Sequence, residues 1–104
     1  MAKVIYEYWY NYGKDRDVTG YELRITKETP KMFYGDVCNL RGFSVTKFAI
    51  KRNDIDKLTI KRNLWGIEYR VWVNADTEAE ARKIAKNRIY THIMKTADEF
   101  MESE

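Results

Sequence analysis

Cysteine, histidine and proline are almost missing from this 104-residue chain, which has one residue of each. A single cysteine cannot form an intramolecular disulfide, and with one histidine it cannot complete a zinc site of Cys and His ligands. Five glycines and one proline are also too few for a flexible linker or a disordered chain. We therefore expect a folded domain that holds no metal and no cofactor.

Long apolar runs are missing as well. The first residues are briefly apolar, but Glu7 and Asn11 interrupt them before the core of a signal peptide could form. No run approaches the roughly 18 apolar residues that are needed to cross a bilayer. We therefore expect a cytoplasmic protein without membrane contact.

Aromatic and charged residues are abundant instead. Aromatic residues make up 14% of the chain, and eight of them are tyrosines. The net charge of +3 is unevenly distributed, because residues 31–62 carry eight basic and three acidic side chains, whereas residues 63–104 carry six basic and eight acidic ones. The basic excess of the middle third can serve phosphate contact or plain solvation.

Alternation with a period of two dominates the first three quarters of the chain and predicts strands. The segment 3–12 places four tyrosines on one side, where their rings can pack in the core and at its rim. A turn with room for one helical turn is expected over 51–56. Further strands are expected over 21–27, 32–38, 43–50 (with a blurred pattern), 58–62 and 67–73.

The period changes after Asn74. Thr77 and Glu80 match a capping box, which predicts the start of a helix that runs to about Met101. Such a helix would be roughly 37 Å long, which exceeds a typical strand of ~17–20 Å. We predict a single α+β domain over 1–104: an antiparallel sheet of about five strands, over about 3–73, with one long C-terminal helix, over about 77–101, packed on one face.

The two halves of this helix point their apolar residues in different directions. Ala81, Ala85 and Ile89 share one direction, whereas Tyr90, Met94 and Met101 centre on another. The helix therefore bends or breaks near His92, or the twist and loops of the sheet cover its end, or its second half packs against another chain. For the last case the candidate protein contacts are Tyr90, Met94 and Met101, and a second copy of the chain is one candidate partner.

Residues with catalytic chemistry are few and uncombined. His92 has no carboxylate four residues away on the predicted helix, and no base is placed near Cys38, for which we expect a buried thiol. Asp54 and Asp56 are flanked by lysine and arginine, which favours ion pairing in a turn over metal binding. We therefore expect a protein that is not an enzyme.

A basic and aromatic sheet surface is the stronger candidate. If the apolar positions of 21–27 and 67–73 face one core, then Trp72 lies outward beside basic side chains, as a platform for base stacking and phosphate pairing. The alternative is that Trp72 packs under a loop and the charges only solvate the sheet. The candidate nucleic-acid contacts are Arg24, Lys61, Arg70 and Trp72.

The loop between 58–62 and 67–73 carries a second candidate site. Leu64 and Trp65 lie at its tip, where they can insert into a pocket of a protein partner or fold back over the end of the sheet.

Three segments carry a resemblance to a class of proteins: GYELRITKETPKMFYG, FAIKRNDIDKL and YRVWVNADTEAEARKIAKNRI. With them the chain resembles small phage- and prophage-encoded proteins of low-GC Gram-positive bacteria. The resemblance implies binding to a host or phage macromolecule. The leading hypothesis is a small non-enzymatic binding protein that contacts a protein or a nucleic acid. The alternatives are a phage-type inhibitor or regulator acting by protein–protein contact, and a structural, dimeric domain without nucleic-acid contact.

Overall fold

The computed structural model describes residues 4–41, 43–64 and 66–102, with side chains over the same ranges apart from 63 and 97–102. The predicted α+β fold with an antiparallel sheet and one C-terminal helix is confirmed, although the sheet has six strands rather than about five. The elements are β1 (Val4–Tyr12), β2 (Thr19–Glu28), β3 (Met32–Asn39), β4 (Ser44–Lys51), the 3₁₀ helix η1 (Arg52–Asp54), β5 (Leu58–Asn63), β6 (Gly66–Val73) and α1 (Glu78–Glu102).

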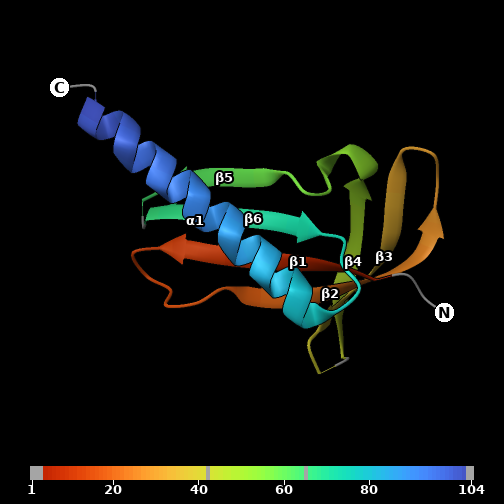
Figure 1. Ribbon diagram of the computed structural model, residues 1–104. Helices are drawn as coiled ribbons and strands as arrows, with labels where there is room; N and C mark the ends of the chain where they lie inside the picture. The colour runs from red at the N-terminus through yellow and green to blue at the C-terminus, as the bar shows by residue number, and fades with distance from the viewer. Residues whose placement is uncertain (1–3, 42, 65, 103–104) are drawn as a thin grey trace.

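The sheet has the strand order β4-β3-β2-β1-β6-β5, and every neighbouring pair is antiparallel (Figure 1). The first strand is therefore central, because β2 pairs with one of its edges and β6 with the other. At the middle of β1, Tyr8 lies opposite Gly20 of β2 and Val71 of β6. The blurred segment over 43–50 does form a strand, which is β4 at one edge.

The strands β4 and β5 follow each other in the chain but lie at opposite edges of the sheet. A flat sheet of this order would put them roughly 24 Å apart, with about 4.8 Å between neighbouring strands. The link 52–57 begins with η1, which rises only about 2 Å per residue, so it is too short to cross a flat sheet. The sheet therefore has to curl, and β3 and β4 turn away from the direction of β5 and β6 (Figure 1).

Two features of the backbone support this curl. The pairing of β2 with β3 is irregular between Ile25 and Lys27, and irregularities of this kind increase local twist. In addition, β3 approaches β2 so closely at Gly35 that a Cβ there would lie 1.9 Å from the backbone oxygen of Arg24. Only glycine fits at this position.

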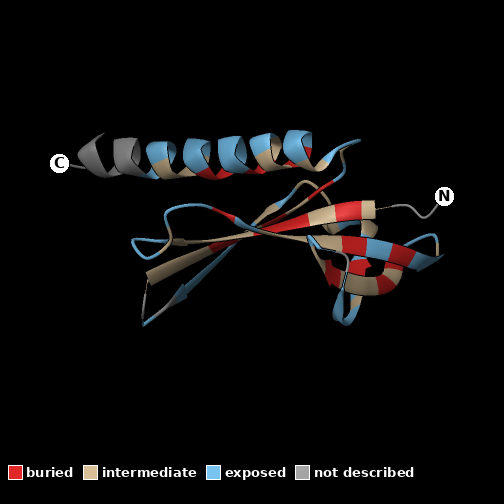
Figure 2. Cartoon of the chain, turned by 90° about the horizontal axis from the view of Figure 1, so that it is seen from below, coloured by how far each residue is buried: buried red, intermediate tan, exposed pale blue. Residues whose placement is uncertain are grey.

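A first group of buried residues, the helix-side core, lies between α1 and the sheet (Figure 2). Ala81 and Ala85 are fully buried and let the helix approach β1 and β6 closely. The predicted tyrosine row is confirmed, because Tyr8 is fully buried while Tyr12 at the end of the strand is 50% exposed. The helix-side core consists of Tyr8, Val18, Tyr69, Val71, Val73, Ala81, Ala85 and Ile89.

A second group, the curl core, lies on the opposite face of the sheet, inside the curl of β2, β3 and β4 (Figure 2). Ile5 pairs with Leu23, one residue along from Tyr6, so both side chains point away from the tyrosine row. Ile55 of the link and Trp72 of β6 pack against this core and cover part of it. The curl core consists of Ile5, Leu23, Ile25, Phe33 and Ile50.

The helix begins as predicted. The Glu80 N–H donates to Thr77 Oγ1 at 3.2 Å, which satisfies one of the free donors of the first turn. Of the alternatives for the second half of the helix, a bend or break near His92 does not occur, because α1 runs straight through that residue (Figure 2). Ile93 packs against the helix-side core, whereas Tyr90 is 62% exposed. No helix in the described part of the chain is long and apolar enough to span a membrane.

Candidate functional site

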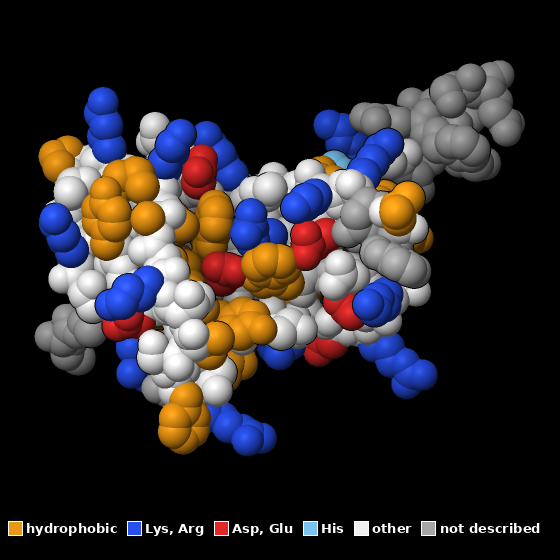
Figure 3. Space-filling view, turned by 180° about the vertical axis from the view of Figure 1, so that it is seen from behind, with side chains coloured by type: hydrophobic (Ala, Val, Ile, Leu, Met, Phe, Trp, Pro, Cys, Tyr) orange, Lys and Arg blue, Asp and Glu red, His pale blue; other side chains and the backbone are white. Residues whose placement is uncertain are grey.

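The face of the sheet that points away from α1 carries hydrophobic side chains with charged ones among them (Figure 3). We call the part of this face over β1, β2, β5 and β6 the open face. Its rows follow from the register, because Trp9 lies between Thr19 and Arg70, and Glu7 lies between Tyr21 and Trp72. Apolar side chains gather along the middle of this face, with acidic and basic ones among them (Figure 3).

Glu7 is the only charged residue that is buried within the described residues, with 8% of its surface exposed. Its carboxylate accepts two indole N–H groups: Trp72 Nε1 donates to Oε2 at 2.9 Å, and Trp9 Nε1 donates to Oε1. A buried carboxylate needs such donors, because its loss of hydration is costly. Glu7 therefore fixes the orientation of both tryptophans.

Arg70 completes this arrangement. Its guanidinium carbon lies 4.9 Å from the centre of the Trp9 ring and 5.1 Å from the centre of the Trp72 ring. Both distances are in the range of cation–π attraction. Glu7, Trp9, Arg70 and Trp72 thus form one contiguous group, which we call the Trp–Arg cluster.

The structure brings together only part of the predicted nucleic-acid surface. Arg70 and Trp72 are in contact, and Lys61 is exposed on the same face of the neighbouring strand. Arg24, however, pairs with Val4 on the helix side of the sheet, where it forms an ion pair with Glu22 at 3.5 Å. The prediction that all four share one face is therefore wrong for Arg24.

The reason is that buried residues occupy both faces of the sheet. The sequence pattern shows correctly that Leu23 is buried, and its side chain is fully buried in the curl core. The pattern does not show that Leu23 and Val71 point to opposite faces of the sheet. Because they do, Arg24 points to the helix side and not to the open face. The Trp72 side chain packs against the curl core, and the Asp56 N–H of the link 52–57 donates to its carbonyl oxygen at 2.7 Å. That Trp72 stacks on a base stays a prediction.

Two members of the Trp–Arg cluster, Glu7 and Trp9, were not predicted as site residues. The available signal was their position two residues apart on the side of 3–12 that faces away from the tyrosines. Trp72, the hydrogen-bond partner of Glu7, is 65 positions away in the sequence. The antiparallel pairing of β1 with β6, which brings these residues together, has no local signal in the sequence.

A hollow of about 420 Å³ lies on the concave side of the sheet, next to the Trp–Arg cluster. Trp9, Tyr21 and Val45 contribute its aromatic and apolar walls, and Glu7 and Asp15 are the charged residues among those that line it. Asp15 is held by Asn11, whose backbone N–H and side-chain amide donate to Oδ2 at 2.9 and 3.0 Å. We call this feature the acidic hollow.

The predicted protein contacts lie elsewhere. Leu64 is 97% exposed at the tip of the hairpin between β5 and β6, and Met94 is 43% exposed on α1 beside Tyr90. Trp65 and the side chain of Met101 lie outside the described residues. Binding through the hairpin tip or through the second half of α1, including a homodimer, stays a prediction.

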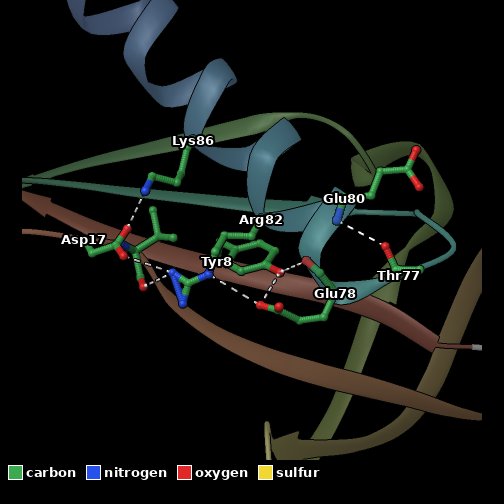
Figure 4. A network of polar contacts seen from close by, with 8 residues as sticks. Tyr8, Asp17, Thr77, Glu78, Glu80, Arg82 and Lys86 are labelled. Atoms are coloured by element: carbon green, nitrogen blue, oxygen red, sulfur yellow. Dashed lines mark hydrogen bonds and ion pairs between the residues drawn. The ribbon is translucent and has the colours of Figure 1, made fainter.

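A polar network ties the start of α1 to the sheet (Figure 4). The buried Tyr8 hydroxyl donates to Glu78, with its oxygen 3.1 Å from both the carbonyl oxygen and Oε1. Burial, and then the Glu78 carboxylate, raise the pKa of Tyr8 well above its ordinary value of 10.0. Asp17 forms ion pairs with Lys86 at 3.0 Å and with Arg82 at 3.2 Å.

The Lys86 ammonium is the main cause that lowers the pKa of Asp17 below its ordinary value of 3.8. Because the Tyr8 side chain is fully buried and bonds to Glu78, this network anchors the start of α1 on the sheet.

The remaining chemistry-bearing residues are dispersed. Cys38 is 2% exposed, which confirms the predicted buried thiol, and His92 packs edge-on against Tyr69 with 5.6 Å between ring centres. Within residues 4–41, 43–64 and 66–102, no three His, Cys, Asp or Glu side chains gather in a group that could hold a metal ion.

Fold and site together define an α+β protein with a helix on one face of a curled antiparallel sheet and an open aromatic face on the other. No protein-family model matches its sequence, and neither a curated protein nor a solved structure matches it. The resemblance to phage-encoded proteins stays a prediction, and the function has to be argued from the open face.

Proposed function

We propose that this chain is a non-enzymatic binding protein that holds a protein partner on its open face. The observation that carries the proposal is the Trp–Arg cluster, in which a buried carboxylate fixes two half-buried tryptophans around an arginine. Tryptophan and arginine are the residue types that most often dominate protein–protein binding energy. Because the cluster is already ordered, a partner would meet side chains that lose little further freedom.

The charges of the open face favour a protein over a nucleic acid. Arg70 and Lys61 are accompanied by Glu7, Glu68 and the nearby Asp15, so this face does not carry the basic excess of the middle third. Affinity for nucleic acids depends on neutralising phosphates with Lys and Arg, which acidic neighbours oppose.

The aromatic rings give a second argument of the same kind. Arg70 lies over the rings of Trp9 and Trp72, at positions that a stacking base would need. A base would have to displace this cation, whereas a protein partner can pack around the cluster as it is.

A binding role also fits the carboxylate of this site better than catalysis does. Glu7 accepts hydrogen bonds from two indoles and is 8% exposed, so it is poorly placed to take a proton from a substrate. Its position is that of a structural support for the rings above it.

The test blocks the open face without disturbing either core. Thr19→Arg adds a long side chain at an exposed position beside Trp9, and Thr91→Arg makes the same change on the exposed side of α1 as the matched control. Both variants and the wild type are immobilised, and bound proteins from the source organism are identified by mass spectrometry after nuclease treatment. We expect a partner that the wild type and Thr91→Arg retain and that Thr19→Arg loses at least about tenfold.

Equal recovery by Thr19→Arg and the wild type would overturn the proposal. Salt-dependent binding of single-stranded DNA or RNA that Lys61→Glu weakens would also overturn it, in favour of a nucleic acid, because removal of a phosphate contact lowers both affinity and salt dependence.

A further inference from the structure

We propose that the acidic hollow receives a lysine or arginine side chain of the partner. This inference rests on the proposed function, since it assumes that the partner lies on the open face. It adds the chemistry of the contact: a basic side chain enters between Trp9 and Tyr21 and pairs with Asp15, while the buried charge of Glu7 adds to the negative potential of the hollow.

Charge is the first argument. The protein has a net charge of +3, yet both charged side chains that line the hollow, Glu7 and Asp15, are acidic. Asp15 uses Oδ2 to accept both Asn11 donors, which leaves Oδ1 to accept from a ligand. Among the described residues, no lysine or arginine nitrogen lies within 4.0 Å of either carboxylate. A cation in the hollow would supply the missing countercharge.

The aromatic walls are the second argument. Trp9 and Tyr21 lie on neighbouring strands and both line the hollow, and aromatic rings attract cations. The chain itself already shows this chemistry, because the guanidinium of Arg70 lies over the Trp9 ring. Arg70 does not line the hollow, so the hollow offers a second place for a cation on the same group of rings.

The rim of the hollow indicates what flanks the basic side chain. Val45 of the edge strand β4 lines the hollow and is 61% exposed. Apolar side chains next to the lysine or arginine would cover this rim. The occupant is therefore a segment of a protein partner that combines one basic with nearby apolar residues, rather than a phosphate-rich ligand.

A titration with single side chains tests the hollow directly. Nα-acetyl-arginine amide is added to ¹⁵N-labelled protein and followed by NMR, with Nα-acetyl-citrulline amide as the neutral control of the same shape. We expect saturable shifts of the Trp9 indole N–H and of the Asn11 and Asp15 amides, and a Kd for citrulline that is at least about fivefold higher. No saturable shift at these positions, or equal binding of citrulline, would overturn the inference.

Three variants assign the effect to the hollow. Asp15→Asn removes a charge and Tyr21→Leu removes a ring, and each should raise the Kd of the arginine probe at least about threefold. Glu68→Gln is the matched control, because it removes a charge from the same face at a position that does not line the hollow. Amide spectra show whether each variant is folded, and an equal effect of Glu68→Gln would count against a specific site.

The two proposals fail in different ways. A protein partner that Thr19→Arg loses, together with no response to the arginine probe, would overturn the cation site and leave the protein-binding function standing. A clear arginine response, together with a partner that Thr19→Arg retains, would overturn the open face as the docking surface.

Discussion

The helix-side core and the curl core lie on opposite faces of one sheet, and they are closed in different ways. A separate element, α1, closes the helix-side core by laying Ala81, Ala85 and Ile89 on β1 and β6. The curl core has no such lid, because the sheet bends around it and the short link 52–57 covers one end.

This difference shows where each core is vulnerable. A core closed by a docked helix depends on side-chain fit at the contact and on the anchors that hold the helix. A core closed by curvature depends on the backbone positions that permit the bend. The curl also explains the acidic hollow. The same bend that encloses the curl core makes this side of the sheet concave beside Trp9.

The largest effect is expected at Gly35. A methyl group there would lie 1.9 Å from the Arg24 carbonyl oxygen, so β2 and β3 must move apart and the curl must open. We expect Gly35→Ala to lower the free energy of unfolding by about 3 kcal/mol, measured by urea denaturation.

Gly13→Ala is the matched control, since a methyl group there meets nothing within 4 Å and is opposed only by a φ of +85°. That change should cost about 1 kcal/mol. Equal losses for the two variants would show that close approach at Gly35 does not set the curl.

A substitution in the helix-side core should lower the free energy of unfolding by less than Gly35→Ala does. Ala85 is fully buried against the sheet, and Ala85→Leu adds volume where the helix has no room. We expect a loss of about 2 kcal/mol in the same assay, because an overpacked contact forces the helix away. Ala79→Leu, at an exposed position of the same helix, should stay within about 0.5 kcal/mol of the wild type. A similar loss for both would mean that the fit of α1 does not decide stability.

The hydrogen bond of Tyr8 should contribute less to the free energy of unfolding than the fit of Ala85, and its contribution should depend on pH. Tyr8→Phe removes a buried hydrogen bond to Glu78 and should cost about 1 kcal/mol near pH 7. The raised pKa of Tyr8 means that the unfolded chain loses this proton first, so folding stability is fully present below about pH 10 and falls as the pH rises above it.

Urea denaturation between pH 8 and about pH 11 tests this sign. The stability of Tyr8→Phe should fall less steeply above about pH 10 than that of the wild type. Parallel slopes would show that Tyr8 ionises alike in the folded and unfolded chain.

The smallest effect on stability is expected at Asp17, an exposed residue of the polar network that ties the start of α1 to the sheet. Asp17→Asn weakens the contacts with Arg82 and Lys86 and should lower the melting temperature slightly at low salt. Salt screens such a pair, so the difference should shrink at high ionic strength. Because the pKa of Asp17 is lowered in the fold, the difference should also shrink as the pH falls below 3.8. A difference that is independent of both salt and pH would assign the effect to the hydrogen bond that Val18 N–H donates to Asp17.

The fold class was predictable because its signals are local. Alternation marks β1 and β6 within their own few residues, and Thr77 marks the start of α1 within one turn. Only the β6 half of the Trp–Arg cluster, Arg70 and Trp72, was predictable. Glu7 and Trp9 join it because β1 pairs with β6, which is the last strand along the chain. The acidic hollow had no signal in the sequence, since its walls come from four strands.

The sequence by itself determined which apolar side chains of β1, β2 and β6 share a face and where the helix begins, since alternation and capping depend on neighbours along the chain. Tertiary structure decided to which face of the sheet each buried side chain points. Alternation shows which residues of one strand share a face, but not which face of the sheet that is. Only the pairing of Ile5 with Leu23 and of Tyr8 with Val71 places Leu23 and Val71 on opposite faces. That pairing removed Arg24 from the predicted surface and brought Glu7 and Trp9 into it.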